Sequence, residues 1–281
     1  MIRILSDSAC GILPDEAAAL GLEVVPLRVA FADGVNLRDG IDLQPGEFYA
    51  RLAAEEKLPL TSQPPIADFI ERFEAAKAAG DTVVGIFVCS DLSGTFQCAK
   101  LAALEADFED VYFVDSRNVT IGQELLVRLA LRLREKGLSA AEIAETLEKE
   151  KGRIRVLAVV DTLKYLHKGG RLSGAAAVVG GALGIKPVVT VLDGKVKMAG
   201  KARGLPGAFV AMFKLMDEQG GLDPSMPFTI GYTDRKSLSE PITRYITRNL
   251  GLEEDLYSPI GPVIGTHVGP GASGIAFFAK E

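Results

Sequence analysis

Cysteine and histidine are scarce in this sequence. Its 281 residues include only three cysteines, Cys10, Cys89 and Cys98, and none of them forms a C-x-x-C pair. An odd number leaves one thiol over in any scheme of disulfides, so a reducing compartment is favoured and we expect a cytoplasmic protein. There are only two histidines, and the chain lacks the cluster of thiolates or carboxylates that a metal would require, so no metal site is expected.

The sequence also has fewer positive than negative charges and few long apolar runs. The chain has 31 Lys and Arg against 37 Asp and Glu, so it offers no long-range attraction to nucleic acid, which is not an expected partner. Its start has neither the charged beginning nor the long apolar core of a signal peptide. The most apolar stretch, residues 174–192, is broken by Lys186-Pro187, and it predicts a buried helix followed by a strand rather than a membrane span.

The first half of the chain alternates apolar runs with amphipathic stretches, which is the pattern of a parallel sheet covered by helices. We expect strands at residues 3–5, 24–29, 83–88 and 111–114, and helices at residues 14–20, 46–54, 66–79, 94–106 and 119–136. The segment 31–43 contains Asp-Gly twice and predicts a hairpin outside this repeating unit.

The pattern changes near residue 152. Ser139 and Glu142 form a capping-box arrangement that begins a helix, and this helix ends in the charged run 148–152. Strands are expected beyond it, at residues 156–160, 187–192, 195–199, 228–233 and 275–279, with a hairpin turn at Asp193-Gly194. The sequence therefore predicts two domains: an N-terminal α/β domain, residues 1–152, with a mainly parallel sheet, and a C-terminal α+β domain, residues 153–281, with a mixed sheet.

Four short segments of small polar residues and glycine interrupt the apolar sequence. They are residues 61–65, 92–95, 169–173 and 265–271. Together they offer hydroxyl groups, bare backbone amides, one guanidinium and one imidazole. This set of groups is suited to holding an anion, either a carboxylate or a phosphate.

Ser93 stands where a strand gives way to a helix, which is where ligands bind in α/β sheets. Ser93 and Thr95 can donate hydroxyl hydrogen bonds, and Gly94 allows a ligand to approach the backbone closely. The amide groups and positive dipole of the helix would favour an anion. The alternative is that Ser93 simply caps the helix.

Thr61 and Ser62 stand in a segment that we expect to be a loop, stiffened by Pro64 and Pro65. A rigid loop can hold a hydroxyl in a fixed place. Thr61 could instead be a helix cap, although it lies far upstream of the helix expected from residue 66. The sequence fits a site role and a capping role of Thr61 equally.

The two histidines have different surroundings. His267 is framed by glycines in an expected loop that lets a ligand come close, so we take it as a candidate site residue. His167, next to Lys168 at an expected helix end, is interpreted as a solvated residue that interacts with the helix dipole. Arg171 follows two glycines and could reach an anion, although a surface arginine is the usual alternative.

Taken in order, these motifs resemble those of the DegV family over essentially the whole chain. The matching segments are Asp7-Ser8-Ala9, Pro26-Leu27, the Thr61 segment, the Ser93 turn, Asp115-Ser116, residues 166–173 and the His267 segment. The resemblance implies a fatty acid buried between the two domains, and no other cofactor. It implies a carboxylate-binding network at Thr61, Ser93 and His267, with Arg171 nearby. It also implies a separate ATP-binding kinase subunit, which phosphorylates the bound acid to an acyl phosphate, while this chain itself is not catalytic.

A fatty-acid site agrees with simple energetics. Burial of about fourteen methylenes at about 0.8 kcal/mol each contributes roughly 11 kcal/mol before the costs of association. Residues 175–183 and the helix after Ile121 are candidate linings. Three departures from the family pattern stand out: Gly11 replaces a common Asp, Glu124 could reshape the pocket, and basic residues are missing after Arg203. Those basic residues would help to meet the kinase or an anionic membrane surface.

The same residues suggest two other functions. A serine hydrolase would use Ser93 as nucleophile, His267 as base and Asp115 as the orienting carboxylate, but Ser93 does not lie in a G-x-S-x-G elbow. A nucleotide-binding protein would need a phosphate loop, and neither G-x-x-x-x-G-K-[ST] nor a G-x-G-x-x-G between strand and helix is present. The fatty-acid carrier is therefore the preferred hypothesis.

Overall fold

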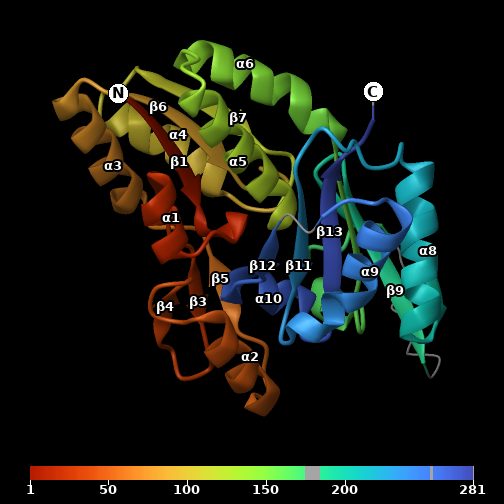
Figure 1. Cartoon of the computed structure of the whole chain (residues 1–281). Coiled ribbons are helices and arrows are strands. Elements are labelled where there is room, and N and C mark those ends of the chain that lie inside the picture. The colour runs from red at the N-terminus through yellow and green to blue at the C-terminus, as the bar shows by residue number, and fades with distance from the viewer. Residues whose placement is uncertain (175–183, 254–255, 281) are drawn as a thin grey trace.

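The computed structural model describes residues 1–174, 184–253 and 256–280. Figure 1 shows a helix-covered sheet in the N-terminal half and a larger sheet in the C-terminal half. The expected α/β and α+β fold class is confirmed, because one sheet is parallel and the larger one is mixed. The helix that was expected within residues 174–192 falls largely outside the described residues. Within those residues, no helix combines the length and the apolar character needed to cross a membrane.

The parallel sheet has the strand order β2, β1, β6, β7, with bounds Leu22–Val25, Ile2–Asp7, Thr82–Phe87 and Val111–Asp115. Helices α3 (Ile66–Ala79) and α4 (Thr95–Glu105) pack together over one face through an aromatic cluster that includes Phe69, Phe73 and Phe87. Helices α5 (Ile121–Glu135) and α6 (Ala140–Glu150) also contact this sheet, but through residues that are not part of the aromatic cluster. The short helices η1 (Ser8–Cys10) and α1 (Pro14–Leu20) follow β1. The capping box predicted at Ser139 is formed.

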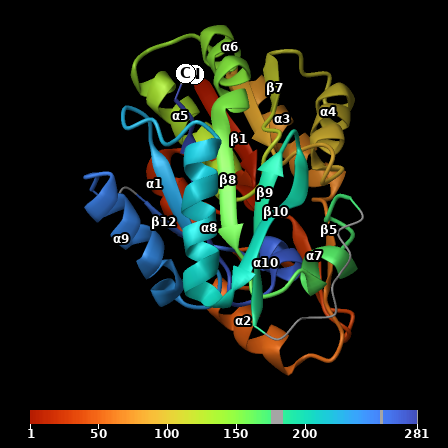
Figure 2. The same ribbon diagram turned by 90° about the vertical axis from the view of Figure 1, so that its right-hand side faces the viewer.

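The mixed sheet has six strands in the order β10, β9, β8, β13, β11, β12. Their bounds are Lys195–Arg203, Ile185–Leu192, Ile154–Val159, Ser273–Phe278, Phe228–Tyr232 and Tyr257–Pro259. Among the strand pairs of this sheet in the described ranges, only β11 and β12 are parallel. Helix α8 (Gly204–Glu218) lies along this sheet (Figure 2), and together with α9 (Glu240–Asn249) it covers one apolar face. The short helix η3 (Lys236–Ser239) precedes α9.

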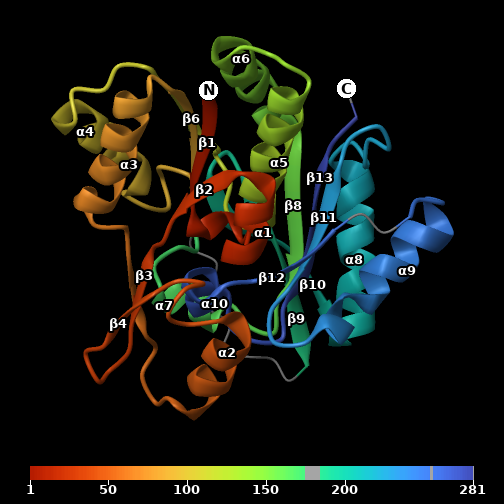
Figure 3. The same cartoon turned by 60° about the vertical axis from the view of Figure 1, so that its left-hand side comes forward.

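Helix α5 is the packing element that joins the two sheets. It contacts β1 and β6 of the parallel sheet, and also β8, β11 and β13 of the mixed sheet (Figure 3). Its residues from Ile121 to Val127 are all buried. A single apolar cluster accordingly includes Ile4, Leu125 and Phe278. The chain passes from one half to the other at η2 (Lys151–Arg153), so the domain boundary expected at residue 152 falls at a change of sheet, although the boundary itself stays a prediction.

A third, three-stranded sheet was only partly foreseen. Strands β4 (Asn36–Arg38), β3 (Arg28–Ala30) and β5 (Leu60–Ser62) are antiparallel. A hairpin is present, but it spans residues 28–38 rather than the expected 31–43, because its first strand is β3. The single strand expected over 24–29 was wrong: it divides into β2 and β3 in different sheets. Pro26 lies at the break, because proline has no N–H to continue a ladder. Helices α2 (Pro45–Ala54), α7 (Lys164–Lys168) and α10 (Pro262–Val268) lie in the same region.

Candidate functional site

A cavity of about 370 Å³ opens at the carboxyl ends of β1 and β6. Ala9 follows β1 and Val88 follows β6, and both line the cavity. Strand β2 lies on one side of β1 and β6 lies on the other, so the strand order reverses at this point. Open α/β sheets bind their ligands at such a switch point, outside the carboxyl ends of the strands.

The mixed sheet forms the apolar wall of this cavity. Val156, Ala158 and Val160 face the cavity from β8 and its end, while the alternating residues Leu157 and Val159 belong to the apolar cluster beneath α8. This alternation is the two-residue period of a strand. Further valines come from the neighbouring strands, namely Val189, Val191 and Val196.

The lining that we expected from the helix after Ile121 was wrong for the described residues. Helix α5 contributes none of the described lining residues, because its faces are buried between the two sheets. Only Val119 and Thr120, just before the helix, reach the cavity. The other predicted lining, residues 175–183, lies outside the described residues.

One end of the cavity is polar and contains the predicted site residues. Six of the seven predicted residues line the cavity directly, namely Thr61, Ser62, Ser93, Gly94, Arg171 and His267. The seventh, Thr95, lies behind them and is hydrogen-bonded to Ser93. They come from the segment before α3, the turn before α4, the segment after α7 and the end of α10. Their ligand contacts stay a prediction, but the fold places groups that are up to 206 residues apart in the sequence within hydrogen-bond distance.

Thr61 and His267 form the central contact of this polar end. The Thr61 Oγ1 atom lies 2.8 Å from His267 Nε2. Thr61 and Ser62 are not in a loop, as expected, but in the edge strand β5, where Thr61 pairs with Val29 of β3. His267 likewise lies in the last turn of α10 rather than in a loop. Secondary structure therefore fixes both side chains more firmly than the sequence suggested.

The end of α10 packs too closely to admit side chains at two glycines. A Cβ at Gly265 would lie 2.6 Å from Phe48 Cε1 and from the Tyr49 hydroxyl, so this turn can rest directly on α2. Gly269 ends the helix with a φ of 78°, which favours glycine, and its Cβ would lie 2.3 Å from the Tyr165 ring. These close approaches explain why glycines surround a histidine that is helical.

Ser93 is held by its neighbour Thr95. The two hydroxyl oxygens are 2.8 Å apart, and Ser93 Oγ also accepts a hydrogen bond of 3.3 Å from the Thr95 backbone N–H. Helix α4 is assigned Gly94 as its N-cap, but Gly94 has helical dihedral angles, and the bond from the Thr95 N–H is of the kind that a capping serine accepts, so the capping role of Ser93 stands beside ligand binding. A hydroxyl can donate and accept at once, which leaves Ser93 Oγ able to take part in a further bond at the cavity.

Gln63 is a lining residue that sequence reasoning missed. Its Oε1 atom would lie 2.2 Å from a Cβ at Gly94, so the glycine leaves the space that this amide occupies. The sequence feature that could have pointed to Gln63 is the following Pro64, which biases Gln63 toward an extended conformation. The identity of the residue it meets, Gly94, depends on tertiary structure.

Arg171 supplies the positive charge of the site. Its guanidinium donates to the backbone oxygens of Leu92 at 3.3 Å and Gly169 at 2.8 Å, which ties it to the segment just before Ser93. It is therefore anchored and half-buried rather than a free surface arginine. His167, in contrast, is exposed in the last turn of α7, as expected.

His267 is held in its neutral form. Burial, and after it the nearby charge of Arg171, together lower the pKa of its imidazole from 6.5 to about 4. The Nδ1 atom is buried, has no hydrogen-bond partner among the described residues and would lie 2.2 Å from a Cβ at Gly169. A neutral imidazole paired with Thr61 can orient the threonine hydroxyl without adding a charge to the site.

The geometry does not assemble a hydrolase triad from the described residues. Ser93 Oγ bonds to Thr95, while Asp115 accepts hydrogen bonds from the Ser90 hydroxyl at 2.6 Å and the Arg117 backbone at 3.0 Å. Neither joins His267, whose Nε2 meets Thr61. In the described ranges there is also no group of three His, Cys, Asp or Glu side chains arranged to hold a metal ion.

The departures at Glu124, Gly11 and the segment after Arg203 are structural features away from the cavity. Glu124 is fully buried, forms a 2.7 Å ion pair with Arg128 and accepts a 2.6 Å hydrogen bond from Ser258, so the expectation that it reshapes the pocket is wrong for the described lining. Gly11 ends η1 with a φ of 83°. Arg203 ends β10, and Gly204 begins α8 directly after it.

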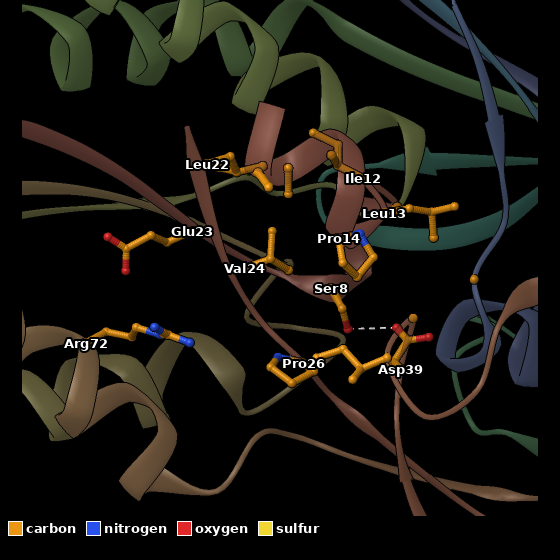
Figure 4. Close-up of a pocket in the computed structure, with 16 residues that line it drawn as sticks. Ser8, Ile12, Leu13, Pro14, Leu22, Glu23, Val24, Pro26, Asp39 and Arg72 are labelled. Atoms are coloured by element: carbon orange, nitrogen blue, oxygen red, sulfur yellow. Dashed lines mark hydrogen bonds between the residues drawn. The ribbon is translucent and has the colours of Figure 1, made fainter. Parts of the chain in front are cut away.

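Asp39 holds the opposite end of α10 from His267. Figure 4 shows its carboxylate meeting the Ser8 hydroxyl, at 2.7 Å, beside a separate pocket of about 250 Å³. The other carboxylate oxygen accepts from the Val263 backbone N–H at 3.3 Å. Gly261, at the N-cap of α10, has no side chain to do this, so Asp39 serves as its capping acceptor from another part of the chain. Burial raises the pKa of Asp39 to about 7.

Stability is expected to fall as the pH is lowered through the titration range of His267. Its pKa is about 4 in the folded chain against 6.5 ordinarily, so between these values the unfolded state binds more protons. The contribution of neutral His267 to the free energy of unfolding is fully present above pH 6.5 and is lost as the pH falls toward 4. At 1.36 kcal/mol per pKa unit, this contribution is about 3 kcal/mol. Denaturant unfolding of wild type and His267→Gln at several pH values would measure it.

The difference between the two proteins is the useful quantity, because buried carboxyls act with the opposite sign. The pKa values of Asp7 and Asp39 are raised to about 6 and about 7, so their contribution is present at low pH and is lost as the pH rises toward 7. Both remain in His267→Gln and cancel in the comparison. The wild-type advantage should grow from pH 4 to 6.5 and then level off, and a constant difference would contradict the prediction.

Comparisons with known proteins agree on one family. A family model described as "Uncharacterised protein, DegV family" matches residues 1–280. A DegV domain-containing protein of Caldanaerobacter subterraneus subsp. tengcongensis is 35% identical, over 99% of each chain. A Thermus thermophilus structure, described as fatty acid binding of a DegV family protein, matches with a TM-score of 0.88 and 31% identity over 99% of each chain. A stearic acid-binding protein of Eubacterium ventriosum matches with a TM-score of 0.86 and 27% identity, over 98% of this chain and 97% of its own. This chain therefore belongs to the DegV family.

Proposed function

We propose that this protein binds a long-chain fatty acid in the cavity between its two sheets. The observation that carries the proposal is an apolar wall of strand residues that ends in hydroxyl, imidazole and guanidinium groups. Ser93 and Thr61 hydrogen-bond the carboxylate, His267 orients Thr61, and Arg171 lends positive potential. The fatty-acid ligands named for the Thermus and Eubacterium proteins support this assignment.

The two ends of the cavity have different energetic roles. Each buried methylene contributes about 0.8 kcal/mol, so the chain of the acid supplies most of the affinity. Each charge-assisted hydrogen bond adds only about 1.5–3 kcal/mol, and part of that offsets desolvation. The polar end therefore determines which end of the ligand lies beside Ser93, and it holds the carboxylate in one orientation.

A fixed carboxylate suits a phosphoryl transfer, since such reactions depend on positioning. This protein presents the bound acid to a separate ATP-binding kinase subunit in the cytoplasm, which converts the acid to an acyl phosphate for phospholipid metabolism. It is a non-catalytic carrier, and the domains 1–152 and 153–281 each supply part of the site.

A transient contact with a membrane surface would allow exchange of the acid, and the apolar Val210 on α8, which is 68% exposed, suits such a contact.

Mass spectrometry of protein purified without added lipid tests the proposed ligand. Native spectra should show one bound acid per chain, which is lost under denaturing conditions and identified by organic extraction. A protein that is empty, and that also fails to take up added stearic acid, would overturn the proposal while leaving the fold assignment intact. Ester turnover by the isolated protein would instead revive the hydrolase hypothesis.

A further inference from the structure

A second hollow adjoins the polar end of the cavity from outside. It has a volume of about 590 Å³, and Thr61, Arg171 and His267 line both hollows. We call it the outer groove and define it by these three residues together with Glu56, Lys57 and Lys168. The outer groove is also lined by Leu58, Pro59 and Leu60, and the Thr61–His267 pair stands where it meets the apolar cavity.

The outer groove is locally positive on a chain of net charge −6. Lys57, Lys168 and Arg171 face one acidic neighbour, Glu56, within it. Lys57 lies between α2 and β5, and Lys168 lies in the last turn of α7; both are exposed. No ion pair of either lysine is found in the parts of the chain that the structure describes. Two exposed ammonium groups without carboxylate partners attract an anion to this groove.

The direction of the bound acid puts an anion beside these cations. With the chain against the valine wall and the carboxylate at Ser93, a group added to the carboxylate points away from the apolar cavity. The outer groove shares Thr61, Arg171 and His267 with the cavity, so it adjoins the polar end at which the carboxylate would lie. An acyl phosphate also carries more negative charge than the carboxylate from which it forms, so it gains more from the positive groove than the free acid does.

We propose that the outer groove is a phosphate subsite, in which Lys57 and Lys168 attract the phosphate of a bound acyl phosphate. This inference rests on the proposed fatty-acid function and extends it to the product. Arg171 reaches both hollows and is anchored by Leu92 and Gly169, so it marks the boundary between the carboxylate and phosphate positions. The two lysines favour the phosphorylated form over the free acid without contacting the acyl chain.

A long-chain alkyl phosphate is a stable probe for this subsite. The test compares the Kd of octadecyl phosphate with that of stearic acid, for wild type and for the double variant Lys57→Gln/Lys168→Gln. Each exposed charge contributes about 0.5 kcal/mol, or about twofold, so the double variant should bind octadecyl phosphate about fivefold more weakly at low salt. Stearic acid affinity should change less than twofold, and the difference should shrink at high salt.

The matched control is Lys100→Gln/Lys214→Gln, which removes the same charge from exposed lysines outside both hollows. It should leave the affinities for both ligands unchanged. Equal weakening of both ligands in the groove variant, or unaltered octadecyl phosphate binding, would overturn the phosphate subsite while leaving the fatty-acid function in place. Failure of wild type to bind stearic acid would overturn both.

Discussion

Replacement of Ala158 by phenylalanine is expected to lower the affinity for stearic acid about 100-fold. Ala158 is the small residue of the β8 face that lines the cavity, between Val156 and Val160. A benzyl group there occupies the space of about three or four methylenes of the ligand. At about 0.8 kcal/mol for each displaced methylene, the loss is about 2.5–3 kcal/mol, which is a factor of about 100 in Kd. Displacement of a fluorescent fatty acid would measure it.

A series of ligands and variants separates cavity filling from general damage. An acid whose chain ends before the blocked part of the cavity should lose much less affinity than stearic acid, so a series of acids of increasing length should show where the loss begins. Ala158→Val adds only two carbons and should have a smaller effect, and Ala78→Phe on the exposed surface of α3 should have none. An unchanged affinity of Ala158→Phe for stearic acid would place the acyl chain elsewhere.

Replacement of Ser93 by alanine is expected to weaken stearic acid binding by about 10- to 100-fold. Loss of a charge-assisted hydrogen bond of about 1.5–3 kcal/mol gives this range. The same substitution removes the partner of the buried Thr95 hydroxyl, so the Tm should also fall by a few degrees. Binding is measured by calorimetry at a temperature where the variant is fully folded.

The control ligand is stearyl alcohol, which has the same chain but no carboxylate. Its affinity should change much less in Ser93→Ala, because the apolar wall is intact. Ser237→Ala, at an exposed serine of η3, serves as the matched variant and should bind both ligands as wild type does. If Ser93→Ala retained full affinity for the acid, Ser93 would not contact its carboxylate.

The position of the site could be predicted well because its motifs lie at the ends of regular elements. Apolar runs such as 83–88 gave β6, and the Ser93 turn follows from where that strand stops and α4 begins. The predictions failed at Pro26, where one expected strand divides, and at Thr61 and His267, which lie in β5 and α10. Short elements of three to seven residues carry too little periodicity to be seen without their partners.

The sequence by itself determined the class of fold, the family and the chemical groups available at the site, because these depend on local patterns and on motifs in series. Tertiary structure alone decided which groups meet. The 2.8 Å contact of Thr61 with His267 joins residues 206 positions apart. The valine wall requires β8, β9 and β10 to pair in one register, and Asp39 reaches Val263 only because α10 packs beside the three-stranded sheet. Long-range contacts of this kind depend on packing, which no local pattern of residues encodes.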